Sequence, residues 1–330
     1  MGKLANAPPG GSKRGAGMAV FEPPPDEVLR AVLDGRPVRI VLATTSFAAR
    51  EAARRHAAAP AAALALARAA TAGLLLATLT KDDERVTLQV LGDGPLGGVT
   101  VDATAAGRVR AYVKNPEAPL LPAAGARASL ARAIGHTGVV SVIRDLGLGQ
   151  PFSGSTAIRS GEIDEDVERY LEESEQVVSA LAADALFAPD GTIALAAGLL
   201  VQALPGSDGA DAVAEARALV SDGALARVLG AGIDDGQLHD AEGLLAAVLG
   251  DRLGRIELLD RRPVLFQCAC SRARAGASLA SLGESELAAM ILDEGKAEVT
   301  CNFCRERYEF DEAELERIRR ETAKQVGPPS

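Results

Sequence analysis

Two short stretches, Cys268-Ala269-Cys270 and Cys301-Asn302-Phe303-Cys304, hold all four cysteines of this 330-residue chain. Thirty residues separate the two pairs, which is enough for a small helical and hairpin module that brings four sulfurs to one point. Four thiolates in tetrahedral geometry are a preferred shell for zinc. The sequence therefore predicts a metal site with the four cysteines as its ligands.

Two other interpretations of the cysteines are weaker. Structural disulfides are usual in short secreted chains, whereas this chain is long enough for a conventional core, and we expect no apolar leader behind Met1. Buried cysteines that act as small apolar residues would not gather in the last fifth of the sequence. Paired C-x-C and C-x-x-C elements instead favour zinc or zinc-coupled redox chemistry.

The surroundings of the cysteines predict a small folded module. Four of the ten aromatic residues of the chain lie beside or between them, namely Phe266, Phe303, Tyr308 and Phe310. Alternation predicts strands at 264–268 and 297–301, and a hairpin closed by residues 308–310. Helices are expected at 271–282, 284–293 and 311–322, the last one capped by Asp311. A module of this size needs a metal to supplement its core.

Composition excludes several classes of protein. The mass of 33.9 kDa, 48% hydrophobic residues and net charge of -10 predict a soluble globular protein of two or three domains. Residues 261–330 hold 11 basic against 12 acidic side chains, so this region lacks the basic stripe of a nucleic-acid binder. We expect no nucleic-acid partner.

Two apolar segments resemble membrane spans only superficially. Residues 57–79 are rich in Ala and Leu, but Pro60 and Arg68 interrupt them, which favours the core helix of a soluble domain. Residues 192–204 are apolar for about a dozen positions and predict a buried strand or a pair of strands. We expect no membrane partner and a cytoplasmic location.

Pattern and turn residues predict an α+β fold with an N-terminal sheet-and-helix domain, a helical linker and a small C-terminal zinc-binding module. Expected strands are 38–45, 85–91, 98–103, 108–114, 138–144 and 152–158, and expected helices are 48–56, 61–80, 164–176, 210–222 and 240–249. The last two helices are rich in Ala and Gly and should be marginally stable. The expected divisions are a disordered arm at 1–20, an N-terminal domain at 21–187, remaining strands and linker at 188–260, and the module at 261–330.

No catalytic arrangement is predicted. The turn Gly92-Asp93-Gly94 lacks the following Lys and Ser or Thr of a phosphate loop, which favours a tight hairpin turn. His56, His136 and His239 lie far apart, with no Ser or Cys nucleophile motif nearby. The expectation is a protein that is not an enzyme.

Several short motifs along the chain form one pattern, and its most specific part is the cysteine spacing. The motifs are Phe266-x-Cys268-x-Cys270-Ser271, Ser281-Leu282-Gly283 with Glu286-Leu287, Val299-x-Cys301-x-x-Cys304, Tyr308-x-Phe310, Asp34-Gly35-x-Pro37-Val38-Arg39, Gly92-Asp93-Gly94-Pro95-Leu96 and Tyr170-x-x-x-Ser174-Glu175-Gln176. With these motifs the chain resembles the redox-regulated 33 kDa heat-shock chaperones, the HslO family, over about residues 26–322.

The resemblance implies a holdase chaperone that oxidation activates, protecting other proteins from oxidative and heat-induced aggregation under stress. It implies one zinc ion on the four thiolates of the inactive reduced form. Oxidation would form the disulfides Cys301–Cys304 and then Cys268–Cys270, expel zinc and unfold about residues 208–260. The resemblance further implies unfolded client proteins as partners, a reduced monomer and an oxidised homodimer.

Two alternatives stay open on the residues alone. A dithiol-disulfide oxidoreductase would use Cys301-x-x-Cys304, although a thioredoxin-like site places this motif at a helix start and has no second pair. A plain zinc-ribbon adaptor would hold its metal against mild oxidant.

Overall fold

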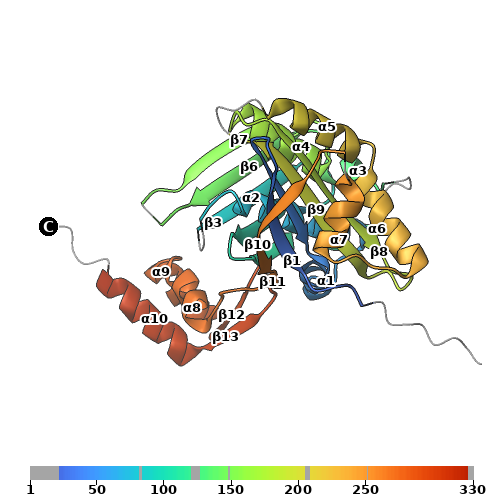
Figure 1. Ribbon diagram of the computed structural model, residues 1–330. Helices are drawn as coiled ribbons and strands as arrows, with labels where there is room; N and C mark the ends of the chain where they lie inside the picture. Colours follow the sequence, from blue (N-terminus) through green and yellow to red (C-terminus); the bar gives the residue numbers. More distant parts are fainter. Residues whose placement is uncertain are drawn as a thin grey trace, which may run out of the picture.

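A computed structural model describes residues 22–81, 84–119, 127–147, 149–204, 209–250 and 252–325. The arm expected at residues 1–20 lies outside these ranges. The described chain forms two mainly antiparallel sheets with helices between and beside them, and a separate group of short elements at the C-terminal end (Figure 1). The α+β class is confirmed.

The first sheet has five antiparallel strands in the order β10-β1-β2-β9-β8. Its strands are β1 (Glu27–Leu33), β2 (Val38–Thr44), β8 (Ser179–Phe187), β9 (Ile193–Ala203) and β10 (Ile256–Pro263). Residues 192–204 were expected to be one or two strands and are the single central strand β9, which is buried along its whole length. A strand covered on both faces reads as a continuous apolar run, which explains this sequence.

The second sheet has six strands in the order β11-β5-β4-β3-β6-β7. Its strands are β3 (Arg85–Gly92), β4 (Val99–Thr104), β5 (Arg108–Val113), β6 (Gly138–Asp145), β7 (Phe152–Ala157) and β11 (Leu265–Phe266). All neighbours are antiparallel except β11, which pairs parallel with β5. Strands 3 to 7 lie where the sequence predicts them, whereas the strand expected at 264–268 is reduced to two residues.

The turn at Gly92-Asp93-Gly94 is wider than the tight hairpin expected, because β4 begins only at Val99. A Cβ on Gly92 would collide with the backbone oxygen of Ile134, and one on Gly94 with that of Ala133. The motif therefore allows two backbone segments to approach closely.

Helix α2 (Pro60–Ala77) packs against both sheets and is flanked by α1 (Ser46–Arg55) and α4 (Ile163–Glu173), with the short α3 (Ala131–Ile134) beyond. Among the described residues α2 is the one helix that is long and apolar enough to cross a membrane, and 94% of it is buried inside the protein. The prediction that residues 57–79 form a core helix is confirmed. A helix that is apolar on all sides belongs in the middle of a core.

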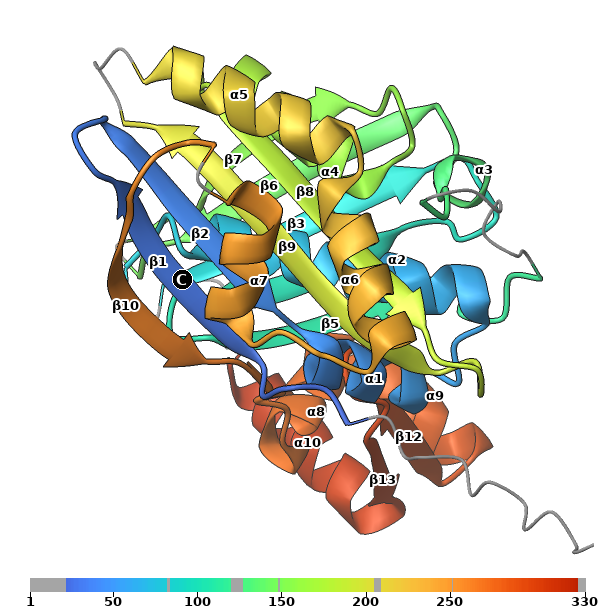
Figure 2. The ribbon, with the colours of Figure 1, turned by 45° about the vertical axis from the view of Figure 1, so that its right-hand side comes forward.

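Three helices cover the outer face of the five-stranded sheet: α5 (Ala210–Ser221), α6 (Ala224–Asp235) and α7 (Ala241–Leu249) (Figure 2). We call residues 210–249 the linker helices. Val213, Leu229, Leu244 and Leu249 pack from them onto Leu42, Leu199 and other residues of this sheet. The sequence predicts α5 and α7 but not α6, whose interior holds Gly230 and Gly232.

The chain returns to the N-terminal domain after the linker helices. Strand β10 pairs with β1 along the edge of the same sheet that contains β9. Two of the expected divisions therefore fall inside this sheet: 187/188 lies between the paired strands β8 and β9, and 260/261 lies within β10. Both ends of the linker helices are held by one sheet.

The C-terminal module contains α8 (Arg272–Ala280), α9 (Glu284–Asp293), the hairpin of β12 (Lys296–Thr300) and β13 (Arg307–Asp311), and α10 (Glu312–Gln325). These elements follow the predicted order. Asp311 caps α10, since its carboxylate accepts the N–H of Glu314 at 2.9 Å. The buried apolar core of the module is small, consisting of Ala275, Leu279, Leu287, Ala297, Phe310, Leu315 and Ile318.

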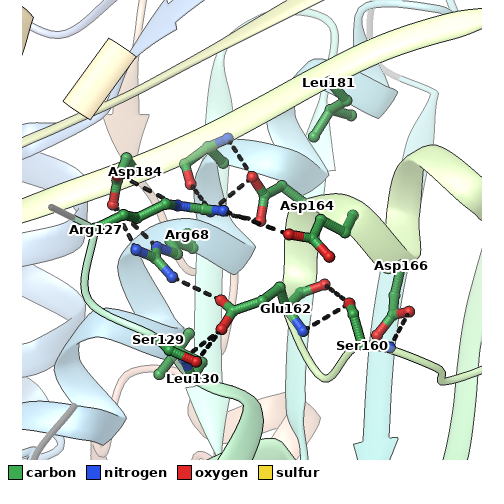
Figure 3. A network of polar contacts seen from close by, with 12 residues as sticks. Arg68, Arg127, Ser129, Leu130, Ser160, Glu162, Asp164, Asp166, Leu181 and Asp184 are labelled. Atoms are coloured by element: carbon green, nitrogen blue, oxygen red, sulfur yellow. Dashed lines mark hydrogen bonds and ion pairs between the residues drawn. The ribbon is translucent and has the colours of Figure 1, made fainter. Parts of the chain in front are cut away.

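A buried ionic network joins α2 to the start of α4 and to β8 (Figure 3). Arg68 is fully buried and donates to Asp184 at 2.6 Å and to Glu162 at 3.0 Å. Arg127 pairs with Asp164 at 2.6 Å and reaches the same Asp184 at 3.4 Å. Removal of one partner from such a network leaves a buried charge without compensation.

We predict that Arg68→Ala lowers the free energy of unfolding of the N-terminal domain by about 3–5 kcal/mol, because Glu162 and Asp184 lose their shared cation. Urea unfolding followed by circular dichroism measures this change. The control is Arg54→Ala, which breaks an exposed pair with Glu51 and should cost less than about 1 kcal/mol. Equal losses in the two variants would contradict the prediction.

Asp26 lies where the N-terminal domain meets the start of the C-terminal module. Its carboxylate accepts the N–H of Ala48 in the first turn of α1 at 2.8 Å, and its backbone oxygen accepts the N–H of Val264 at 2.8 Å. Burial penalises the charged carboxylate more than the backbone N–H groups of Ala48, Phe47 and Ser46 favour it, and it raises the pKa of Asp26 to about 6.

Because this pKa exceeds the ordinary value of 3.8, the folded state holds the proton more tightly than the unfolded state. The resulting stabilisation is complete below pH 3.8 and is lost as the pH rises through about 6, a change of about 3 kcal/mol. Asp26→Asn keeps an oxygen acceptor and removes the titration. We predict that its urea stability falls less between pH 4 and 7 than that of the parent. An unchanged pH dependence would contradict this, and exposed Asp235→Asn is the control.

Candidate metal centre

The four cysteine sulfurs, far apart in the sequence as two pairs, lie within 4.8 Å of one another. Two of the separations cross the pairs: Cys268 Sγ lies 3.7 Å from Cys301 Sγ, and Cys270 Sγ lies 3.2 Å from Cys304 Sγ. All four cysteines are free thiols in this structure. The structure thus brings together every ligand that the sequence predicts.

The second cysteine pair is placed by the turn between β12 and β13. The N–H of Cys301 donates to the oxygen of Glu306 at 2.8 Å, and the N–H of Arg305 donates to the oxygen of Cys301 at 2.9 Å. Arg305 takes a positive φ of 60°, which closes the turn. The first pair lies between β11 and α8, where the Ser271 hydroxyl caps the helix.

The donor set fits zinc. A zinc–thiolate bond of about 2.3 Å in a tetrahedron places neighbouring sulfurs about 3.8 Å apart, within the range in which these sulfurs lie. Four sulfurs without an oxygen donor select zinc or an iron–sulfur cluster over hard cations such as magnesium. The group of four is therefore able to bind a metal ion, and zinc is the ion that we propose below.

Two side chains outside the cysteine set donate to the sulfurs. The Tyr308 hydroxyl lies 3.1 Å from Cys270 Sγ, and Nη1 of Arg110 lies 3.3 Å from Cys268 Sγ. Tyr308 belongs to β13 of the module, whereas Arg110 belongs to β5 of the N-terminal domain. Donors of this kind orient metal ligands and partly neutralise their charge.

The surroundings of the cysteines shift their pKa values in opposite directions. Burial opposes ionisation of Cys268, but the Cys270 N–H and the Arg110 guanidinium outweigh it and lower the pKa of Cys268 to about 7. Burial raises the pKa of Cys301 and that of Cys304. The hydrogen bond to Cys270 raises the pKa of Tyr308, so this hydroxyl remains a donor. Cys268 is thus more easily held as thiolate than Cys301 or Cys304.

The sequence gives no signal for the part of this site that comes from the N-terminal domain. Nη1 of Arg55 donates to the backbone oxygen of Cys304 at 3.0 Å, and Nε2 of His56 lies 3.1 Å from that of Phe303. His56, for which the sequence predicts no catalytic role, is buried at this junction. His136 and His239 lie outside the cysteine group. More than two hundred positions separate Arg55 from Cys304, so only the fold reveals the contact.

Comparison with known proteins agrees with this geometry. The family model described as Hsp33 protein matches residues 26–311. The chain belongs to the Hsp33 family. Among curated members, the 33 kDa chaperonin of Geobacillus kaustophilus is 37% identical over 89% of this chain and 97% of its own length. That of Bacillus subtilis is 36% identical over 91% of this chain and 100% of its own length.

A solved family member shows the same fold. The crystal structure of the 33 kDa chaperonin of Thermotoga maritima matches with a TM-score of 0.77 at 30% sequence identity. The match covers 91% of the present chain and 99% of the Thermotoga chain. The resemblance deduced from the cysteine spacing is confirmed by these matches to Hsp33 proteins.

We predict that Tyr308→Phe weakens metal binding about tenfold, because Cys270 loses a hydroxyl donor while the ring stays in place. Competition with a chromogenic chelator measures the affinity for zinc. Tyr170→Phe, which removes a hydroxyl from α4 in the N-terminal domain, is the matched control. Equal affinities of the two variants would show that the Tyr308 hydroxyl does not support the site.

Proposed function

We propose that this Hsp33-family protein is a redox-regulated holdase chaperone, with Cys268, Cys270, Cys301 and Cys304 as its switch. The observation that carries the proposal is the convergence of four free thiols from two distant segments. Membership of the family supports the chaperone activity. The protein would act by binding unfolding proteins and not by catalysis.

In the reduced form the four cysteines would hold one zinc ion, which keeps them as thiolates. Binding of structural zinc by peptides of this type is worth about 10–16 kcal/mol. The small apolar core of the module makes its fold depend on such a contribution.

Oxidation converts two thiolates into one disulfide and gives two electrons to the oxidant. With hydrogen peroxide, the two electrons and two protons yield two water molecules. We propose that Cys301 pairs with Cys304 first and Cys268 with Cys270 second, as the family resemblance implies. Each disulfide removes two of the four ligands, so the module loses its metal and its fold.

Loss of the module would release the linker helices from the five-stranded sheet. Their interiors hold Gly230, Gly232 and Gly243, which lower helix stability. Their removal would expose the apolar surface beneath them to unfolding client proteins. We propose a monomer in the reduced state, a homodimer in the oxidised state and a cytoplasmic location, where thiols remain reduced until stress.

The geometry speaks against the oxidoreductase alternative. Cys301 and Cys304 lie in the turn between β12 and β13 and not at the start of a helix. A helix N-terminus is what lowers the pKa of the reactive thiol in thioredoxin-like sites, and here burial raises the pKa of both cysteines. The adaptor alternative makes a different prediction, which is metal retained during oxidation.

One experiment separates the three functions. The reduced, zinc-loaded protein is treated with hydrogen peroxide at raised temperature, and zinc release and light scattering of a heat-labile client enzyme are followed together. We expect scattering to fall only after zinc has left. Zinc release without any effect on client aggregation would contradict the chaperone function.

The Cys304→Ser variant and a thiol reductant give the controls for this experiment. We expect Cys304→Ser to bind zinc weakly and to suppress client aggregation without peroxide, because the module is already unfolded. Dithiothreitol with added zinc should return the oxidised parent protein to the inactive state. Turnover of a small disulfide substrate with a thiol donor would favour the oxidoreductase instead.

A further inference from the structure

The C-terminal module is attached to the second sheet by a short parallel strand. The N–H of Leu265 donates to the oxygen of Gly107 at 2.9 Å, and the N–H of Gln267 donates to that of Val109 at 3.0 Å. These bonds place the first cysteine pair beside β5. Two hydrogen bonds are a weak attachment, so other contacts must hold the module in place.

Phe303, between the two cysteines of the second pair, supplies such a contact. Its ring meets the ring of Tyr112 edge to face, with centroids 5.0 Å apart and an interplanar angle of 89°. The guanidinium of Arg110 lies 4.1 Å from the centroid of the same ring. Both partners belong to β5, so the metal-binding turn itself docks on the N-terminal domain.

Arg110 contacts the first cysteine pair and the turn that carries the second pair. Its Nη1 donates to Cys268 Sγ at 3.3 Å, and its planar group covers the ring of Phe303. Its Nε and Nη2 both donate to one oxygen of Asp102 on the neighbouring strand β4, at 3.1 Å and 2.6 Å. The side chain is only 17% exposed. Asp102 therefore fixes the guanidinium in one orientation on the sheet.

We propose that Arg110 is a positioning residue of the redox switch: it docks the cysteine module on β5 only while Cys268 is a thiolate and the turn that carries Phe303 is intact. This inference rests on the proposed redox function. It adds a direct connection between the metal centre and the N-terminal domain that does not pass through the linker helices.

The physical basis is that oxidation changes the charge and the position of the sulfur, whereas Arg110 stays fixed on the sheet. A thiolate accepts a strong, charge-assisted hydrogen bond from a guanidinium, whereas a disulfide sulfur is neutral and accepts weakly. Arg110 cannot follow a displaced sulfur because Asp102 holds it on the sheet. A disulfide between Cys301 and Cys304 also reshapes the turn that presents Phe303. Oxidation of either pair thus removes one of the two contacts that Arg110 makes with the module.

The test uses full-length reduced protein loaded with zinc and the variants Arg110→Gln and Phe303→Leu. Hydrogen exchange of the Leu265 and Gln267 amides reports docking directly. We expect both variants to keep one zinc per chain and to exchange these amides about tenfold faster. The control, Arg85→Gln, removes an arginine that pairs with Asp145 on the same sheet, and it should leave their exchange unchanged.

The second measurement is the rate of zinc release at a fixed peroxide concentration. We expect about tenfold faster release in Arg110→Gln and in Phe303→Leu, and a less than multiplicative increase in the double variant, since the two changes share the contact between the guanidinium and the ring. Phe303→Leu leaves every charge in place, so it separates docking from a simple charge effect on thiol reactivity.

Exchange and zinc release equal to those of Arg85→Gln in both variants would overturn the inference. If Arg110→Gln fails to fold, the exchange and zinc-release rates of Phe303→Leu alone decide whether the inference holds. Exchange of the two amides is measured without oxidant and without client. It therefore tests docking even if the parent protein does not protect clients. A failure to protect clients would count against the proposed function alone.

Discussion

Four sulfurs within 4.8 Å of one another are the constraint on which the C-terminal part of this protein depends. The module around them buries few large apolar side chains and exposes Leu282 and Leu292. Unlike the N-terminal domain, which encloses α2 between two sheets, the module packs its helices on one another and on a two-stranded hairpin, with a small core. Under the proposed function, its fold and the state of its thiols would therefore be a single equilibrium.

The cysteine site was predictable because its information is local. Two pairs with short spacing fix the ligand set, and the flanking alternation and caps fix the elements around them. The same reasoning failed for β8, whose Ala-rich sequence favours a helix by propensity and becomes a strand only by pairing along β9. It also failed for β1, where the consecutive residues Val28 and Leu29 are both buried, one in the core on each face of the sheet, so the alternation is lost.

The surroundings of the site were not predictable, for a physical reason. The contact between Arg110 and Cys268 joins positions 158 apart in the sequence, and it exists because β11 adds to the edge of the sheet beside β5. The residue types alone do not predict this contact, since most arginines of a soluble protein lie on its surface. Family resemblance supplies the fold and the cysteines, but the electrostatic setting of each sulfur follows only from the three-dimensional structure.

The chain returns to the five-stranded sheet at strand β10, so the segment that carries the linker helices is a loop whose two ends are fixed. Strands β9 and β10 belong to one sheet, so residues 204–255 begin and end on the same rigid surface. A segment that unfolds between such anchors gains less entropy than a free tail, because closing a loop of this length costs about 3–4 kcal/mol. The anchors also keep its helices close to the face that they cover. Reversal of the proposed switch would then resemble the closing of a lid and would not require a new folding search.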